Sequence, residues 1–118
     1  MAAAQTLAGR KILLVEDDQL IAHETVRAFE ESGAVVVGPA ASVHDALALV
    51  GQNARLAVLD INVTGEKVYS FAAVLADGGV PFVFATSCSR AEIPRRYAAV
   101  PRFGKTPDPQ RVARALFR

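Results

Sequence analysis

Acidic, hydroxyl and basic side chains follow apolar runs at four places along this chain of 118 residues. Three acidic residues, 16–18, come after the first apolar run, and Asp60 comes after the third. Thr86 and Ser87 follow the fourth run, and Lys105 follows a short fifth one. Carboxylates, hydroxyls and an ammonium group together suit phosphoryl transfer, in which catalysis consists mainly of positioning and charge neutralisation.

Asp60 is the best candidate for a nucleophile in such a reaction, because an aspartate carboxylate can accept a phosphoryl group covalently. It ends the most apolar of the central runs, where packing fixes its position. Carboxylates that lie close together repel one another, and Mg²⁺ offsets this repulsion well because it prefers oxygen ligands. The sequence therefore predicts a magnesium-assisted site built on the acidic residues 16–18 and Asp60, with Lys105 as a further positive charge.

Five apolar runs are predicted to be strands, and four of them are strong. The strong runs are residues 11–15, 35–37, 56–59 and 80–84, and the weak fifth run is 102–104. The strong runs are continuous rather than alternating with polar residues. This pattern is typical of parallel strands that are covered by helices on both faces.

Between and after the runs, apolar residues recur at the spacing of an α-helix, and this pattern predicts five helices. The segments are about 22–33, 43–50, 68–77, 90–98 and 109–117. Asp18, Ser42 and Asp108 are the predicted N-caps of the first, second and last helices. The fourth helix is the weakest, because Pro94 is compatible only with the first turn of a helix.

The element order (βα)₅ predicts a single α/β domain with an open, doubly wound, flavodoxin-like fold. Its parallel five-stranded sheet has the expected order 2-1-3-4-5, and ligands bind at the carboxyl ends of the strands in such sheets. Residues 1–9 are expected to form a flexible tail, and residues 10–118 the domain. The candidate residues should therefore meet at one edge of the sheet.

Composition limits the class of protein. Hydrophobic residues make up 52% and charged residues 21% of the chain, which indicates a folded domain. The single cysteine excludes an intramolecular disulfide and fits a reducing compartment. No apolar run approaches the roughly 20 residues of a membrane helix, and the first ten residues lack the pattern of a secretory signal. A cytoplasmic protein without a membrane partner is expected.

The net charge of +1 is unevenly distributed. Residues 1–60 hold four basic and eight acidic residues, whereas residues 61–118 hold nine basic and four acidic residues. This asymmetry predicts a basic docking face in the C-terminal half for an acidic protein partner. The alternative is that the arginines only solvate helix surfaces. Nucleic-acid binding is not expected, because residues 10–118 are assigned to the one domain and no separate output domain remains.

Four fragments of the sequence resemble the receiver domain of bacterial two-component response regulators. They are LVEDD at 14–18, VLDINVTG at 58–65, FATS at 84–87 and FGK at 103–105, and they come in the order of that family. The resemblance implies that Asp60 is the phosphoacceptor and that Mg²⁺ is the cofactor.

The resemblance also implies roles for the other matched residues. Glu16 and Asp17 would be the acidic metal pair, and Asn62 would give its main-chain carbonyl to the metal. Thr86 and Lys105 would contact the phosphoryl group.

The implied function is that of a single-domain response regulator rather than a classical enzyme. A sensor histidine kinase or a histidine phosphotransfer protein would phosphorylate Asp60, and the regulator would promote its own phosphorylation and dephosphorylation. Partner binding would switch through a face formed by the fourth helix, the fifth strand and the fifth helix. The FAT stretch and the segment 97–101 are closest to an alphaproteobacterial subfamily of stand-alone receivers with a Phe-Ala-Thr-Gly-x-Tyr motif.

The sequence departs from this family at several positions. Ser87 and Ser89 stand in place of the Gly and Tyr of the subfamily, and Arg102 stands where many receivers carry a switch aromatic residue. Thr106 follows Lys105 in place of the usual proline. The Lys105–Thr106 bond is predicted to be trans, because a cis bond before a non-proline residue costs about 2.5–4 kcal/mol.

Three alternatives come from other classes of protein. A pseudo-receiver that binds partners without phosphorylation is suggested by Arg102, Ser89 and Thr106. A haloacid-dehalogenase-like phosphatase is suggested by the spacing of Asp60 and Asn62, although Asn62 cannot act as a general acid. A P-loop ending at Lys105 is disfavoured because Pro107 disfavours helical geometry in the preceding residue.

Three further residues are expected to be structural. Cys88, which lies just past Thr86, is interpreted as a small packing residue, with a redox-sensing thiol as the alternative. His23 and His44 lack the spacing of metal ligands.

Overall fold

A five-stranded parallel sheet lies at the centre of the computed structural model, which describes residues 7–117. Its strands are β1 (Lys11–Val15), β2 (Val35–Ala40), β3 (Leu56–Leu59), β6 (Phe82–Ala85) and β7 (Arg102–Phe103). The spatial order is β2-β1-β3-β6-β7, and every neighbouring pair is parallel. This arrangement confirms the predicted order 2-1-3-4-5 and the doubly wound α/β fold.

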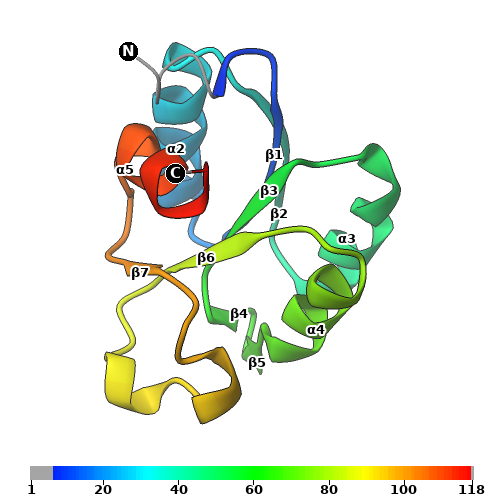
Figure 1. Cartoon of the computed structure of the whole chain (residues 1–118). Helices are drawn as coiled ribbons and strands as arrows, with labels where there is room; N and C mark the ends of the chain where they lie inside the picture. Colours follow the sequence, from blue (N-terminus) through cyan, green and yellow to red (C-terminus); the bar gives the residue numbers. More distant parts are fainter. Residues whose placement is uncertain (1–6, 118) are drawn as a thin grey trace.

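Helices cover both faces of the sheet and make three layers (Figure 1). Four α-helices lie within the described range: α2 (Gln19–Glu31), α3 (Val43–Ala48), α4 (Tyr69–Asp77) and α5 (Pro109–Phe117). Helices α2 and α5 pack on one face, and α3 and α4 pack on the other. Among residues 7–117, no helix has the length and apolar character needed to cross a bilayer.

The two cores are built from alternate residues of the same strands. In β1, Leu13 and Val15 face α3 and α4, whereas Ile12 and Leu14 face α2 and α5. All residues of β3 and β6 are buried. Because both faces are covered, these strands can be apolar at every position, which explains their continuous runs in the sequence.

Short polar side chains start the helices. The amide of Ile21 donates to Asp18 Oδ1 at 3.0 Å, and the amide of Asp45 donates to the Ser42 hydroxyl at 3.0 Å. Asp108 Oδ1 accepts a hydrogen bond from the Gln110 amide at 3.0 Å. The three predicted N-caps are therefore present. Helix α3 is followed by the short 3₁₀ helix η1 (Val50–Gln52).

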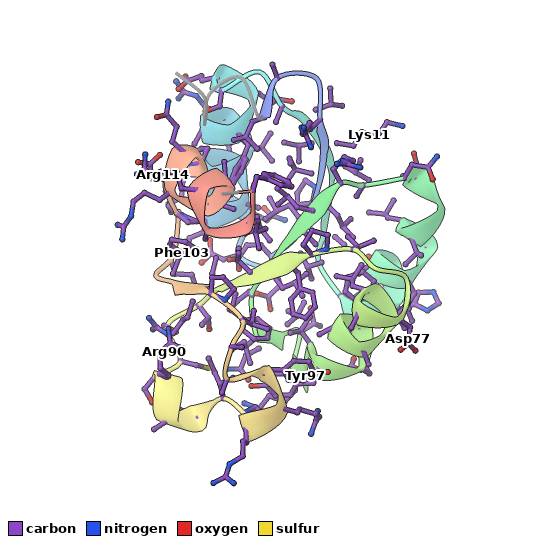
Figure 2. All side chains as sticks on the ribbon, viewed as in Figure 1. Lys11, Asp77, Arg90, Tyr97, Phe103 and Arg114 are labelled. Atoms are coloured by element: carbon purple, nitrogen blue, oxygen red, sulfur yellow. The ribbon has the colours of Figure 1, made fainter. Side chains whose placement is uncertain are left out.

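The prediction of an α-helix over residues 90–98 is wrong. Two 3₁₀ helices, η2 (Arg90–Glu92) and η3 (Arg95–Tyr97), occupy this segment. Pro94 has no amide hydrogen to donate and forces Ile93 into an extended conformation, with ψ at 129°. Ile93 and Tyr97 are nevertheless buried, and Figure 2 shows Tyr97 beside α4. The apolar spacing in this segment therefore reflects burial rather than an α-helix.

A small hairpin between β3 and α4 was not predicted. It pairs β4 (Asn62–Val63) with β5 (Glu66–Lys67) in antiparallel register. Thr64 and Gly65 connect the two strands, with φ angles of 50° and 75°. Positive φ at both positions of a two-residue connection is the signature of a type I′ turn.

The beginning of the described chain packs on the domain. Leu7 is fully buried, and the amide of Gly9 donates to the Gly33 carbonyl at 2.8 Å. These residues belong to the segment 1–9 that was expected to be a tail, whose first six residues lie outside the described residues.

Candidate functional site

The carboxyl ends of β1, β3 and β7 bring two acids and a lysine into contact. Lys105 Nζ lies 2.6 Å from Asp60 Oδ2 and 3.1 Å from Glu16 Oε1. The two acids are buried, with 5% of each residue exposed. The structure thus joins side chains that are 45 and 89 residues from Lys105 in the sequence.

Backbone hydrogen bonds continue the sheet into this site and fix both acids. The Asp60 amide donates to the Val15 carbonyl, and the Glu16 amide donates to the Ala40 carbonyl, each at 2.9 Å. Each carboxylate also has an amide donor: Ile61 to Asp60 Oδ1 at 2.8 Å and Asp18 to Glu16 Oε2 at 3.0 Å, an oxygen that Lys105 Nζ also contacts at 3.4 Å. Both acids are therefore held by main-chain as well as side-chain contacts.

Burial and ion pairing set the protonation of this group. Burial raises the pKa of Glu16, and the negative charge of Asp60 raises it further, although the Asp18 amide and Lys105 act in the opposite direction. For Lys105, burial lowers the pKa, but hydrogen bonds to Asp60 and Glu16 outweigh it, so its pKa lies above the ordinary value. Lys105 is therefore a stable cation at neutral pH.

Three carboxylates offer oxygen atoms to a common point. Ligand oxygens of Glu16, Asp17 and Asp60 all lie within 4.8 Å of one another. Asp17 is exposed, and its Oδ2 accepts a hydrogen bond from the Thr64 amide at 2.7 Å. A set of hard oxygen donors, two of them buried beside a single ammonium group, fits Mg²⁺.

The side chain of Asn62 is bonded to residues outside this acidic set. Its Oδ1 accepts a hydrogen bond from Lys67 Nζ at 2.6 Å, and its Nδ2 donates to Cys88 Sγ at 3.2 Å. These two contacts occupy the side-chain amide group. Cys88 is buried, and its contact with Asn62 places it against the β4–β5 hairpin.

Comparison with known proteins identifies the family. No family model matches the chain, and no curated protein matches it. Among solved structures, SdrG from Sphingomonas melonis Fr1 is 36% identical over 98% of this chain and 96% of its own, with a TM-score of 0.78. The BeF3-activated conformation of SdrG, from Pseudomonas melonis Fr1, is 34% identical over 94% of this chain and 98% of its own, with a TM-score of 0.79.

The response regulator PhyR from Brucella abortus shares the fold at 24% identity, with a TM-score of 0.74. The match covers 98% of this chain, which spans about half (49%) of PhyR. The chain belongs to the receiver-domain family of response regulators.

Thr86 lies at the carboxyl end of β6 in this receiver and is buried. Its amide donates to the Phe103 carbonyl at 2.9 Å, and its hydroxyl accepts a hydrogen bond from the Cys88 amide at 3.1 Å. The hydroxyl is thus held within its own loop.

Arg102 has a role in the receiver that sequence reasoning missed. Its Nε donates to the Cys88 carbonyl at 2.7 Å, and its Nη2 donates to the Thr86 carbonyl at 3.2 Å. The guanidinium therefore holds the loop after β6 from the neighbouring strand β7. A planar group with several donors can make both bonds at once, whereas an aromatic residue at this position cannot.

Thr106, which follows Lys105, lies in the left-handed region with φ at 54°. This conformation is unusual for a β-branched residue. The Lys105–Thr106 peptide bond is trans, in agreement with the prediction. Thr64 is a second threonine with a left-handed backbone conformation. Its hydrogen bond to Asp17 was also missed by sequence reasoning. The Thr-Gly pair at 64–65 is only a weak turn signal.

Proposed function

We propose that this receiver accepts a phosphoryl group on Asp60 from the phosphohistidine of a sensor histidine kinase or a histidine phosphotransfer protein. The observation that carries the proposal is the contact of Lys105 Nζ with the buried carboxylates of Asp60 and Glu16. The near full-length similarity to SdrG supports a role as a stand-alone regulator.

Asp60 would act as the nucleophile of the transfer. One carboxylate oxygen attacks the phosphorus as the bond to the imidazole nitrogen breaks. Asp60 Oδ1 is held by the Ile61 amide, so the carboxylate is oriented before the donor arrives. Lys105 contacts the other oxygen and is placed to bind an oxygen of the incoming group.

Glu16, Asp17 and Asp60 would hold Mg²⁺, together with the main-chain carbonyl of Asn62. When bound, the metal neutralises charge on the phosphoryl oxygens. The same residues would serve dephosphorylation by water, so the receiver would promote both reactions without being a classical enzyme.

Phosphorylation would be read out through the Thr86 loop. The phosphoryl group carries about −1.5 to −2 of charge at neutral pH, and rotation of the Thr86 hydroxyl toward it would break the contact with the Cys88 amide. Arg102 couples that loop to β7. The signal would therefore reach the face formed by η2, η3, β7 and α5. This face corresponds to the predicted one, with the 3₁₀ helices η2 and η3 in place of the fourth helix.

An acidic protein surface is the proposed partner of this face. Arg90, Arg95 and Arg96 are exposed on η2 and η3, and Figure 2 shows Arg90 on the outer side of this segment. Arg96 lies over the rings of Tyr69 and Tyr97, at 6.0 and 5.0 Å from their centroids. Arg95 is therefore the better residue for testing charge without disturbing packing.

Changing Arg95 to Glu should weaken binding of the phosphorylated receiver to its partner about tenfold and lower the salt dependence of association. Surface plasmon resonance at two ionic strengths measures both quantities. Arg55→Glu, at the amino-terminal end of the sheet, is the matched control and should bind normally. Unchanged binding by Arg95→Glu would remove the basic face from the proposal.

A pseudo-receiver that binds its partner without phosphorylation is a second candidate. Arg102 favours it, because its two hydrogen bonds hold the Thr86 loop in a defined state without a phosphate. Equal partner affinity of wild type and Asp60→Asn in the presence of a phosphodonor would favour this candidate. The phosphatase alternative falls away with membership of the receiver family.

The main proposal is tested by intact mass after incubation with acetyl phosphate and Mg²⁺. Wild type should gain one phosphoryl group that is stable in acid and labile in base, whereas Asp60→Asn should gain none. Asp77→Asn, at the exposed end of α4, is the control for loss of an aspartate and should be modified like wild type. An unmodified wild-type protein, or modification that survives in Asp60→Asn, contradicts the proposal.

We also propose a cytoplasmic location, which the single cysteine supports. Placement near the Phe-Ala-Thr-Gly-x-Tyr subfamily is part of the same proposal. It is supported by the stretch Phe84-Ala85-Thr86, which forms the end of β6 and the residue after it.

A further inference from the structure

Thr64 connects three separate segments at the acidic edge of the sheet. It lies at the tip of the β4–β5 hairpin, and its amide donates to Asp17 Oδ2 at 2.7 Å. Its hydroxyl donates to the carbonyl of Ala41, directly after β2. One residue thus ties the hairpin to the loops that follow β1 and β2.

The backbone of Thr64 is in an unfavourable conformation for its residue type. Its φ angle is 50°, and the first position of a type I′ turn is normally Asn, Asp or Gly. A β-branched residue with positive φ is an outlier that persists only where surrounding contacts hold it. The bond from the hydroxyl to Ala41 is such a contact, and Asn or Gly could not make it in the same way.

Asp17 has little other means of being fixed. It is exposed, unlike Glu16 and Asp60, so packing does not hold its carboxylate. A hydrogen bond from the Thr64 amide to one carboxylate oxygen orients the group and leaves the second oxygen free. Groups that hydrogen-bond to a metal ligand commonly change metal affinity by about 10- to 100-fold.

We propose that Thr64 is a positioning residue for divalent-cation binding by Asp17. Its hydroxyl anchors the hairpin tip on Ala41, and the anchored amide then holds the Asp17 carboxylate toward Glu16 and Asp60. The inference rests on the proposed metal-binding function of these three acids. It adds a residue of the hairpin, 47 residues from Asp17 in sequence, to the determinants of that site.

Isothermal titration of the full chain with MgCl₂ tests this proposal. Thr64→Val keeps the shape but removes the hydroxyl, and we expect its dissociation constant for Mg²⁺ to rise about tenfold. Thr64→Ser retains the hydroxyl and should bind within about twofold of wild type. Thr25→Val is the matched control, because it also removes a threonine hydroxyl that donates to a carbonyl, at 2.8 Å within α2.

Hydrogen–deuterium exchange of the Thr64 amide without metal is the second measurement. Exchange at residue 64 should be slow in wild type and Thr64→Ser, and at least about tenfold faster in Thr64→Val, because the hairpin tip is released. A residue that only supports folding would lower stability without changing Mg²⁺ affinity or this local exchange. If the valine variant does not fold, Thr64→Gly replaces it in both measurements, because glycine suits the turn and lacks the hydroxyl.

Wild-type affinity and wild-type exchange in folded Thr64→Val or Thr64→Gly would overturn the inference. Failure of the wild type to bind Mg²⁺ is a different result. It would remove the metal from the proposed function, and the exchange measurement would then decide alone whether the Thr64 hydroxyl positions the contact with Asp17.

Discussion

Replacing Lys105 by methionine should slow phosphorylation of Asp60 by about a hundredfold or more, the usual cost of losing one charged or polar group that stabilises a transition state. The ammonium is the only cation that the described residues place against both buried carboxylates. Methionine has a similar length but no charge, so it leaves the phosphoryl oxygens without this partner. Incorporation from acetyl phosphate over time, followed by intact mass, measures the rate.

The same substitution should lower the free energy of unfolding at pH 7 by about 2 kcal/mol, because two buried carboxylates lose their counter-ion. Lys105 is about a quarter exposed (27% of its side chain), which limits the loss. This difference in the free energy of unfolding between wild type and Lys105→Met should become smaller as the pH falls. Burial and Asp60 already raise the pKa of Glu16, and the loss of Lys105 raises it further, so the variant regains stability on the acid side as Glu16 takes up a proton.

Lys11→Met is the matched control for Lys105→Met. Lys11 is exposed, and its Nζ donates to the Gln52 carbonyl at the other end of the sheet, at 3.2 Å. This variant should phosphorylate normally, and its stability should not depend on pH differently from wild type. A Lys105→Met protein with wild-type phosphorylation kinetics would exclude Lys105 from the transfer step.

The sheet and its order were predictable because each strand is a continuous apolar run bounded by polar residues. In β3, four apolar residues are followed by Asp60, and the change in polarity coincides with the end of the strand. Parallel strands place such ends at one edge, so the meeting of residues from β1, β3 and β7 required no knowledge of loop structure. The N-caps were equally local, because each depends on a side chain and an amide two or three residues away.

The features that were missed lack a clear local signal in the sequence. The hairpin at 62–67 is too short for a periodic pattern, and its turn has Thr64 where Asn or Gly is usual, so the turn signal was weak. The segment 90–98 has apolar spacing that suits a helix, but Pro94 and the burial of Tyr97 against α4 favour 3₁₀ turns. The contacts of Arg102 with two carbonyls could not be predicted, because they require the loop after β6 to turn back toward β7.

Gly38 shows how the backbone of β2 supports the site. The register of β2 against β1 shifts between Leu13↔Val37 and Val15↔Ala40, so Gly38 and Pro39 form an irregularity in the strand. Gly38 has φ at 104°, which side chains rarely allow. After this irregularity, the Ala40 carbonyl accepts the hydrogen bond from the Glu16 amide. Gly38 therefore brings β2 back into pairing where the acidic residues begin.

Changing Gly38 to Ala should lower the free energy of unfolding by about 3 kcal/mol or more, because strain at positive φ adds to a backbone clash. A Cβ atom at this position would lie 2.8 Å from the Leu14 carbonyl oxygen and 2.9 Å from the Ala40 nitrogen. Neither backbone atom can move without disturbing the β1–β2 pairing. Urea denaturation followed by circular dichroism measures the change.

Gly51→Ala is the matched control, since a Cβ atom there would meet nothing within 4 Å and the residue lies in η1. It should be neutral or stabilise the protein by up to about 1 kcal/mol, through loss of freedom in the unfolded chain. If Gly38→Ala remains folded, its Mg²⁺ affinity should also fall, because the strain displaces Ala40 and with it the Glu16 amide. A Gly38→Ala protein as stable as Gly51→Ala would mean that β2 can pair with β1 without this glycine, and the irregularity would then have no part in placing Glu16.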